Sequence, residues 1–88
     1  MTIEEIYSRF GECTGVTTDS RKCGPGLLFF ALKGDRFDGN EFVRGALEQG
    51  CLYAVMDNAS LYDSSDGRMI LVDNVLETLQ KLAAYHRR

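Results

Sequence analysis

The sequence predicts a small α/β domain in which a small sheet with a parallel βαβ unit carries helices on both faces. Three apolar runs, at 27–32, 52–56 and 69–72, are too short for helices and predict buried strands. Segments with apolar residues at helical spacing lie before, between and after these runs, which is the order of an α/β fold. The 88 residues suffice for one hydrophobic core, so residues 1–88 are expected to form a single domain.

The first helix is predicted near the amino terminus. Residues 2–5 match the S/T-x-x-E capping box, and Gly11 follows the last apolar position, where a helix often ends. Apolar residues at i, i+3, i+4 and i+7 predict a short amphipathic helix that packs on the core. Its buried face would consist of Ile3, Ile6, Tyr7 and Phe10.

A βαβ unit is predicted at the centre of the chain. Residues 15–23 would form a polar connection to the first strand, and a loop at 33–39 would follow that strand. Asn40 stands where a helix N-cap belongs, and Gly50 would end the helix. The next strand would end at Asp57 and lie parallel to the first. The apolar helix face would consist of Phe42, Val43, Ala46 and Leu47.

The remaining residues predict a third strand and a last helix. Residues 58–68 are polar and would connect, at the surface, to the strand that closes at Asp73. Residues 74–77 resemble a helix cap, and the buried stripe of the helix would consist of Val75, Leu76, Leu79, Leu82 and Ala83. No Gly, Asn or Pro ends this helix, so we expect a domain excised from a longer protein, with a frayed natural end as the alternative.

The charge balance argues against nucleic acid as a partner. Ten Lys and Arg stand against thirteen Asp and Glu, a formal net charge of −3, whereas nucleic-acid binding needs clustered basic residues. No apolar run approaches the ~20 residues of a membrane span, and the acidic start differs from a secretory signal. The expected location is the cytoplasm. Cys13, Cys23 and Cys51 lack CxxC spacing and are expected to be reduced thiols.

No catalytic or metal-binding set is apparent in the sequence. The phosphate-loop pattern G-x-x-x-x-G-K-[ST] and the pattern G-x-G-x-x-G are absent. His86 lacks partners at metal-ligand spacing, and nothing pairs it with a Cys nucleophile. Residues 63–67 fail the calcium-loop pattern, because Tyr62 stands where a carboxylate is required. We therefore expect no catalysis, metal or cofactor in this chain alone.

Two polar segments are candidates for binding an anionic ligand. Ligands of open α/β sheets settle beyond the carboxyl ends of the strands, which directs attention to the loop at 33–39. Its Lys, Arg and Gly residues offer cations and backbone N–H groups that suit a phosphate. Residues 17–21 add three hydroxyls and a guanidinium. A solvated turn and a turn bonded to itself are the respective alternatives.

Several segments, taken in order, resemble the amino-terminal domain of the Mur ligases. The segments are 17–21 (TTDSR), 25–34 (PGLLFFALKG), 37–42 (FDGNEF), 46–55 (ALEQGCLYAV) and 70–83 (ILVDNVLETLQKLA). The likeness is strongest to members that add D-alanyl-D-alanine to UDP-N-acetylmuramoyl-tripeptide in peptidoglycan precursor synthesis. It implies that this chain holds the UDP end of the muropeptide. It also implies that ATP, magnesium and D-alanyl-D-alanine are bound by other domains of a longer ligase, where an amine attacks an acyl phosphate.

The resemblance also assigns the expected contacts with the UDP portion. Phe37 could offer an aromatic surface to uracil. Asn40 stands where related ligases often carry His, and an amide keeps hydrogen bonding without a titratable ring, which favours a structural role there. The expected contact residues are Thr18, Ser20, Arg21, Lys33, Gly34, Asp35, Arg36, Phe37 and Asn40.

Two other functions stay open on the sequence alone. The residues that select the incoming amine would lie in other domains, so a ligase that adds the third amino acid to UDP-N-acetylmuramoyl-dipeptide is an alternative. A free-standing α/β module that binds a protein partner through its polar loops is another. A stand-alone enzyme is disfavoured, because no matched acid, base or nucleophile can be assembled from these residues.

Overall fold

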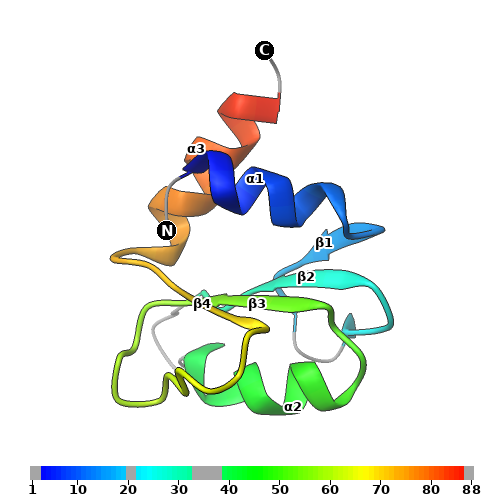
Figure 1. Ribbon diagram of the computed structural model, residues 1–88, viewed down its shortest axis with the longest axis vertical. Coiled ribbons are helices and arrows are strands. Elements are labelled where there is room, and N and C mark those ends of the chain that lie inside the picture. Colours follow the sequence, from blue (N-terminus) through cyan, green and yellow to red (C-terminus); the bar gives the residue numbers. More distant parts are fainter. Residues whose placement is uncertain (1–2, 20–21, 33–38, 87–88) are drawn as a thin grey trace.

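The computed structural model describes residues 3–19, 22–32 and 39–86. These residues contain a four-stranded sheet in the order β1 (Gly15–Thr17), β2 (Leu27–Phe30), β3 (Tyr53–Met56) and β4 (Met69–Leu71). The helices α1 (Ile3–Gly11) and α3 (Val75–His86) cover one face. The 3-10 helix η2 (Gly39–Phe42) leads into α2 (Val43–Glu48) on the other face (Figure 1). The predicted α/β fold with helices on both faces is confirmed.

All neighbouring strands in this sheet are parallel. Val16 pairs with Leu28 between β1 and β2, and Val55 of β3 pairs with both Phe30 and Ile70 on its two sides. The segment from β2 through α2 to β3 is therefore the βαβ unit that the sequence predicts. Because the strands run in one direction, the residues that follow them gather at one edge of the sheet. We call this edge, marked by Thr18, Leu32, Asp57 and Asp73, the carboxyl edge.

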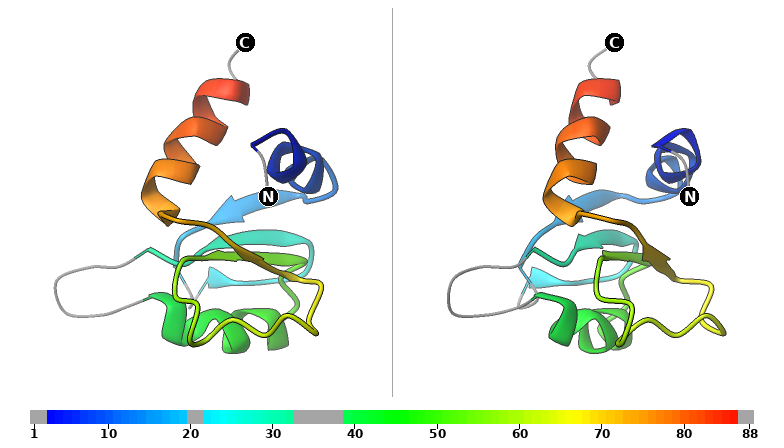
Figure 2. Two further views of the ribbon diagram at one scale, coloured as in Figure 1. Left: turned by 60° about the vertical axis from the view of Figure 1, so that its left-hand side comes forward. Right: turned by 90° about the vertical axis from the view of Figure 1, so that its left-hand side faces the viewer.

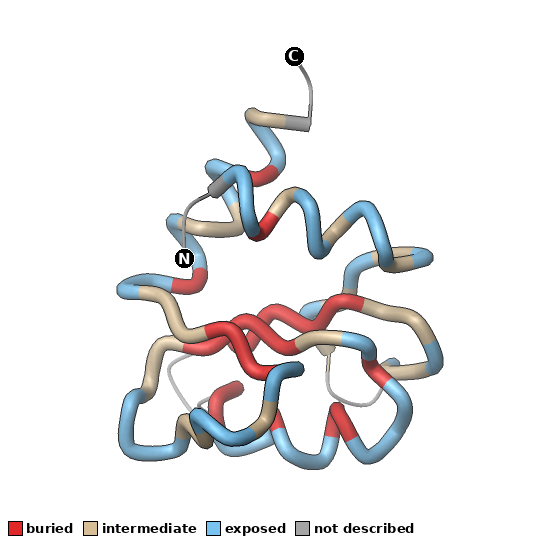
Figure 3. The backbone as a smooth tube through the Cα atoms, in the orientation of Figure 1, coloured by how far each residue is buried: buried red, intermediate tan, exposed pale blue. Residues whose placement is uncertain are grey.

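The buried side chains form one cluster on each side of the sheet. Figure 3 shows the buried residues concentrated along the strands, with further ones in the flanking helices. Successive strand residues point to opposite faces, so Phe29 packs with α2 while its neighbour Phe30 packs on the side of α1 and α3. Both rings are almost wholly removed from water, with exposed fractions of 1% and 0%. Figure 2 shows the resulting three layers, with the sheet between α2 and the other two helices. The central strands β2 and β3 are apolar throughout because both of their faces are covered.

The sequence prediction missed β1. Residues 15–23 were expected to be a polar connection, but Gly15–Thr17 forms a strand that pairs only with β2 at the edge of the sheet. Val16 is 40% exposed there, and its two neighbours are half-buried. An edge strand with one open side needs no continuous apolar run, so its sequence lacks the usual signal.

The expected N-cap of the central helix was also wrong. Asn40 lies inside the 3-10 turn η2, and α2 begins after Phe42, whose side chain makes no capping hydrogen bond. The ring of Phe42 is 43% exposed and does not belong to the buried helix face. Val43, Ala46 and Leu47 are buried as predicted. Asn40 instead bonds residues beyond the end of β3.

The last helix begins as predicted. The Asn74 side chain accepts a hydrogen bond from the backbone N–H of Glu77 at 2.8 Å, which is an N-cap contact. Val75 and Leu82 are buried, whereas Leu76, at 53% exposure, and Ala83 face solvent, so the predicted stripe was too wide. In α1, Ile6 is buried and Tyr7 and Phe10 pack against the same core. The predicted capping residue Thr2 lies outside the described residues.

Candidate functional site

The carboxyl edge brings together parts of the chain that are far apart in the sequence. Thr18 follows β1, Leu32 lies just beyond β2, Asp57 follows β3, and Asp73 lies just beyond β4. Both polar segments that the sequence singles out, 17–21 and 33–39, begin at this edge. The topology thus places the starts of both segments at the same edge of the sheet, which is where ligands of parallel α/β sheets bind. Only the second segment was expected there.

Among the described residues of the first polar segment, Thr18 is exposed, whereas Thr17 and Asp19 are half-buried. Its neighbour Thr17 closes a local turn, in which its hydroxyl both accepts a hydrogen bond from the Asp19 N–H and donates one to the Asp19 carbonyl, each at 3.2 Å. Thr18 is exposed and available to a ligand. Ser20 and Arg21, the other predicted contacts in this segment, lie outside the described residues.

The described residues on either side of 33–38 lie close together. Lys33, Gly34, Asp35, Arg36 and Phe37 lie outside the described residues, so their roles stay predictions. The flanking residues are tied together, because the Gly39 N–H donates to the Leu32 carbonyl at 2.8 Å. A Cβ atom at Gly39 would lie 2.5 Å from that carbonyl oxygen, so only glycine fits this close approach. Leu32 and Gly39, which flank residues 33–38, therefore lie side by side at the carboxyl edge.

Asn40, which follows this closure, ties η2 to the residues beyond the end of β3. Its Oδ1 accepts hydrogen bonds from the backbone N–H groups of Asp57 at 2.9 Å and Asn58 at 3.1 Å. Its Nδ2 donates to Oδ1 of Asp57 at 2.9 Å. Asn40 is 3% exposed, and it is the one polar side chain in the buried class among the described residues. This burial favours the structural role that the amide at this position suggested.

Asp57 extends the hydrogen bonds of Asn40 to α3, and we call these bonds together the network. Its second oxygen, Oδ2, accepts a hydrogen bond from the backbone N–H of Val75, the first residue of the helix, at 3.0 Å. A carboxylate at this position also interacts favourably with the positive end of the helix dipole. Two backbone N–H groups at the start of α3 are therefore already bonded, one to Asp57 and one to Asn74. The negative charge of Asp57 also disfavours a diphosphate directly in front of the helix.

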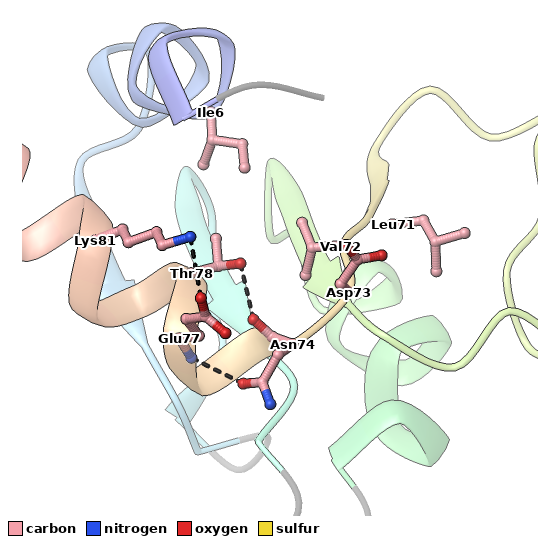
Figure 4. A pocket seen from close by; sticks show the side chains of 8 residues that line it. All are labelled: Ile6, Leu71, Val72, Asp73, Asn74, Glu77, Thr78 and Lys81. Carbon is pink, nitrogen blue, oxygen red and sulfur yellow. Dashed lines mark hydrogen bonds and ion pairs between the residues drawn. The ribbon is translucent and has the colours of Figure 1, made fainter.

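Two hollows lie beside this network. A cavity of about 290 Å³ is lined by Leu32, Asp57, Asn74, Val75 and Leu76 at the carboxyl edge. A second, of about 370 Å³, lies between α1, β4 and α3 (Figure 4). The polar groups of this second pocket bond one another, since Lys81 pairs with Glu77 at 3.0 Å and the Thr78 hydroxyl donates to the Asn74 carbonyl at 2.8 Å. Its acidic lining, which includes Asp73, makes it a poor site for a phosphate.

Sequence reasoning identified Asn40 as a special position but missed Asp57 as its partner. Asp57 was expected only to end a strand. The contact spans 17 positions in the sequence, and local spacing does not report such a bond. A signal was nevertheless present, because polar residues directly after two buried runs of a parallel sheet must meet at one edge.

The three cysteines precede β1, β2 and β3 in the sequence, and none of them forms a disulfide. Cys51 is buried in the core beside α2, and Cys23 packs against the same core. Cys13 instead packs on the side of α1 and α3. Removal from water and a hydrogen bond with the Cys51 thiol raise the pKa of Cys23 from 9.0 to about 12, and the charges of Cys51 and Asp19 add to this effect. The prediction of unpaired thiols agrees with this arrangement.

The raised pKa of Cys23 predicts slow alkylation. Only the thiolate reacts with iodoacetamide, and in the folded chain Cys23 stays protonated as the pH rises from 9 towards 12. At pH 9 we expect Cys23 to be labelled more than about tenfold more slowly in the folded chain than in urea, as followed by peptide mass spectrometry. Equal labelling rates in the two states would contradict the assigned environment.

The described residues lack two further kinds of feature. No group of three or more His, Cys, Asp or Glu side chains among them could hold a metal ion. In the segment 63–67, Asp63 accepts hydrogen bonds from Ser65 and Asp66 accepts hydrogen bonds from Arg68, and these hydrogen bonds lower the pKa of each carboxyl. None of the helices in the described ranges is long and apolar enough to cross a membrane.

Comparison with known proteins identifies the family. The model of the Mur ligase family, described as its catalytic domain, matches residues 12–87. The UDP-N-acetylmuramoyl-tripeptide–D-alanyl-D-alanine ligase of Bacillus subtilis is 44% identical over 69 residues, which are 78% of this chain and 15% of that protein. The UDP-N-acetylmuramoyl-L-alanyl-D-glutamate–2,6-diaminopimelate ligase of Aquifex aeolicus is 42% identical over 69 residues, 78% of this chain and 14% of that protein.

Solved structures agree with these sequence relatives. MurF ligase from Thermotoga maritima in complex with ADP matches with a TM-score of 0.71 and 31% identity, over 80% of this chain and 16% of that chain. MurF from Acinetobacter baumannii matches with a TM-score of 0.75 and 26% identity, over 98% of this chain and 21% of that chain. This chain thus spans about a sixth of the length of its relatives. The resemblance noted in the sequence is confirmed, and the chain belongs to the Mur ligase family.

Proposed function

We propose that this chain is the domain that binds UDP-N-acetylmuramoyl-tripeptide in an ATP-dependent ligase that adds D-alanyl-D-alanine during cytoplasmic synthesis of peptidoglycan precursors. The main support is that both polar segments expected to hold the UDP portion leave the parallel sheet at the carboxyl edge. The two D-alanyl-D-alanine ligases among the relatives, from Bacillus subtilis and Rickettsia prowazekii, make this substrate the first choice.

A ligase that adds diaminopimelate as the third amino acid is the second candidate. Relatives with that name reach 48% identity, although over only 48 residues. Both kinds of ligase carry a UDP-linked muramoyl substrate in their names. The UDP end is therefore the part of the substrate that this proposal concerns, and selection of the incoming amine is assigned to other domains.

The proposed contacts have chemistry suited to a nucleoside diphosphate. Hydroxyls of Thr18 and Ser20 and the guanidinium of Arg21 would donate to phosphate oxygens, and an Arg–phosphate pair gains from charge as well as from two parallel bonds. Lys33 and Arg36, with the backbone N–H of Gly34, would do the same from the second segment. Phe37 would face uracil. Asp35 would accept a bond from a sugar hydroxyl or from its own loop.

Catalysis is assigned to other parts of a longer ligase. This sequence lacks a phosphate loop, and the described residues provide no cluster of metal ligands, so the proposal places ATP and magnesium in other domains. Its part in the reaction would be to bind one end of the substrate and hold the muropeptide in place. Such positioning lowers the activation free energy, because the substrate loses its translational and rotational freedom on binding rather than in the reaction step.

An NMR titration tests the proposed function directly. UMP and UDP-N-acetylmuramoyl-tripeptide would be added to the 88-residue chain while backbone amide signals are followed. We expect shifts of the amide signals at 17–21 and 33–40. We expect none around Cys51, which precedes β3. The absence of shifts at millimolar ligand, or shifts spread evenly over the chain, would contradict the proposed site.

Arg21→Ala provides a second test. Hydrogen bonds to charged groups contribute about 1.5–3 kcal/mol, so the variant should bind the muropeptide about tenfold or more weakly by calorimetry. In a ligase that contains this domain, the same change should mainly raise KM. Arg9→Ala is the matched control, because Arg9 lies over the Tyr53 ring at 5.6 Å, near the start of β3. Equal losses in both variants would argue against a role for Arg21 in binding.

A further inference from the structure

We propose that Asp57 is a positioning residue of the ligand site, which holds η2 and the start of α3 in one arrangement through its bonds to Asn40 and Val75. This inference rests on the proposed function, because it concerns how the carboxyl edge is prepared for the UDP portion. Asp57 itself would not contact the ligand.

The geometry assigns each oxygen of Asp57 to a different element. Oδ1 accepts from Asn40 in η2 at 2.9 Å, and Oδ2 accepts from Val75 in α3 at 3.0 Å. The backbone N–H of Asp57 returns a bond to Asn40 Oδ1 at 2.9 Å. Three elements that meet at the carboxyl edge, the end of β3, η2 and α3, are thus joined by one side chain.

The burial of Asn40 favours this one arrangement of hydrogen bonds over others. Asn40 is 3% exposed, so an alternative position of its amide would leave polar atoms without water or a partner. No buried side-chain polar atom in the described ranges is without a hydrogen bond. A fully bonded buried network rigidifies the elements that it joins.

The joined elements border the proposed ligand site. Gly39, the residue before Asn40, closes the second polar segment onto Leu32. The 290 Å³ cavity is lined by Leu32 and Asp57 together with the first residues of α3. A site that is already ordered before binding loses less conformational freedom when the ligand arrives, and its affinity is higher. Asp57 is not among the expected contacts with the UDP portion, so loosening the network by a change at Asp57 should weaken binding without removing a ligand contact.

An exchange of the two side chains tests this inference. In Asn40→Asp the two carboxylates would face each other, and in Asp57→Asn one amide could not accept from both Asn40 and Val75. In the double variant the carboxylate introduced at position 40 would accept from both backbone N–H groups and from the amide introduced at position 57. The oxygen of that amide would accept from Val75. All four hydrogen bonds of the network are then possible, with one donor and acceptor pair reversed.

The readouts are the affinity for UDP, by calorimetry, and stability, by urea unfolding monitored by circular dichroism. We expect each single variant to bind about tenfold more weakly and the double variant to recover most of this loss. Ile70→Val and Leu82→Ala serve as stability controls, because both residues lie in the core on the side of α1 and α3 and outside the network. We expect one to be destabilised less and the other more than the variants of Asn40 and Asp57. Both controls should bind UDP as the unchanged chain does.

The outcomes separate this inference from the proposed function. If the unchanged chain binds UDP and Asp57→Asn binds equally well, the positioning role is wrong while the proposed function stands. Equal weakening in the stability controls would also overturn the positioning role. If the unchanged chain does not bind UDP, the proposed function fails and the inference fails with it. Should Asp57→Asn not fold, Asp57→Ser, which can still cap Val75 but is too short for Asn40, takes its place.

Discussion

Replacement of Gly39 by Ala is expected to destabilise the domain by about 3 kcal/mol. The added Cβ would lie 2.5 Å from the Leu32 carbonyl oxygen and 2.8 Å from two further backbone atoms of residues 31 and 32. These atoms belong to the chain just beyond the central strand β2, so they cannot move aside without disturbing the sheet. A chain of 88 residues is typically stabilised by roughly 4–13 kcal/mol, so the loss is a large part of the total. Urea unfolding followed by circular dichroism measures it.

The same substitution at Gly45 provides the control. Nothing lies within 4 Å of a Cβ at this exposed position in α2, and Ala is a better helix former than Gly. Gly45→Ala should therefore stabilise the chain by about 0.5–1 kcal/mol. Opposite signs for the two Gly→Ala changes are the expected result, and a neutral effect at Gly39 would contradict the close approach described here.

Truncation of Phe30 to Ala should be about as damaging, with a loss of about 3–5 kcal/mol. The side chain is fully buried at the end of β2, between the sheet and the layer formed by α1 and α3. Removing the ring takes away buried apolar surface and leaves a cavity that Leu28 and Val55 cannot fill without strain. Thermal or urea unfolding would show the loss.

Two companion changes sharpen this prediction. Phe30→Leu keeps much of the volume and should lose clearly less stability than Phe30→Ala. Leu76→Ala removes an apolar side chain that is 53% exposed and should change stability by less than about 1 kcal/mol. A loss at Leu76 as large as that at Phe30 would mean that α3 packs differently from the arrangement in Figure 1.

The central part of the fold could be predicted because burial leaves a strong local pattern. β2 and β3 are covered on both faces, so their sequences are apolar without interruption, and Asn74 caps α3 through a bond between near neighbours. β1 could not be found in this way, because its open edge tolerates polar residues. The widths of the helix faces were overestimated at Phe42 and Leu76, which are apolar yet exposed. Spacing indicates which side of a helix is apolar but does not show how far the neighbouring layer extends.

The candidate site was predictable in part of its location and less so in its internal bonding. The loop after β2 could be placed at the carboxyl edge from the predicted order of elements. The place of 17–21 could not, because it depends on β1, which the sequence did not reveal. Asn40 illustrates the limit, since a residue in the right place for a helix cap instead bonds Asp57 across the sheet. The contacts proposed for Ser20, Arg21 and residues 33–37 stay predictions.

The hydrogen bond between Gly39 and Leu32 holds together the two residues that flank 33–38. The Gly39 N–H donates to the Leu32 carbonyl at 2.8 Å. Because this bond lies outside 33–38, we expect the register of β2 and the position of η2 not to depend on those residues. The free-energy cost of closing a loop also rises only slowly with its length. We therefore expect residues 33–38 to tolerate substitutions and changes in length while the sheet keeps its pairing.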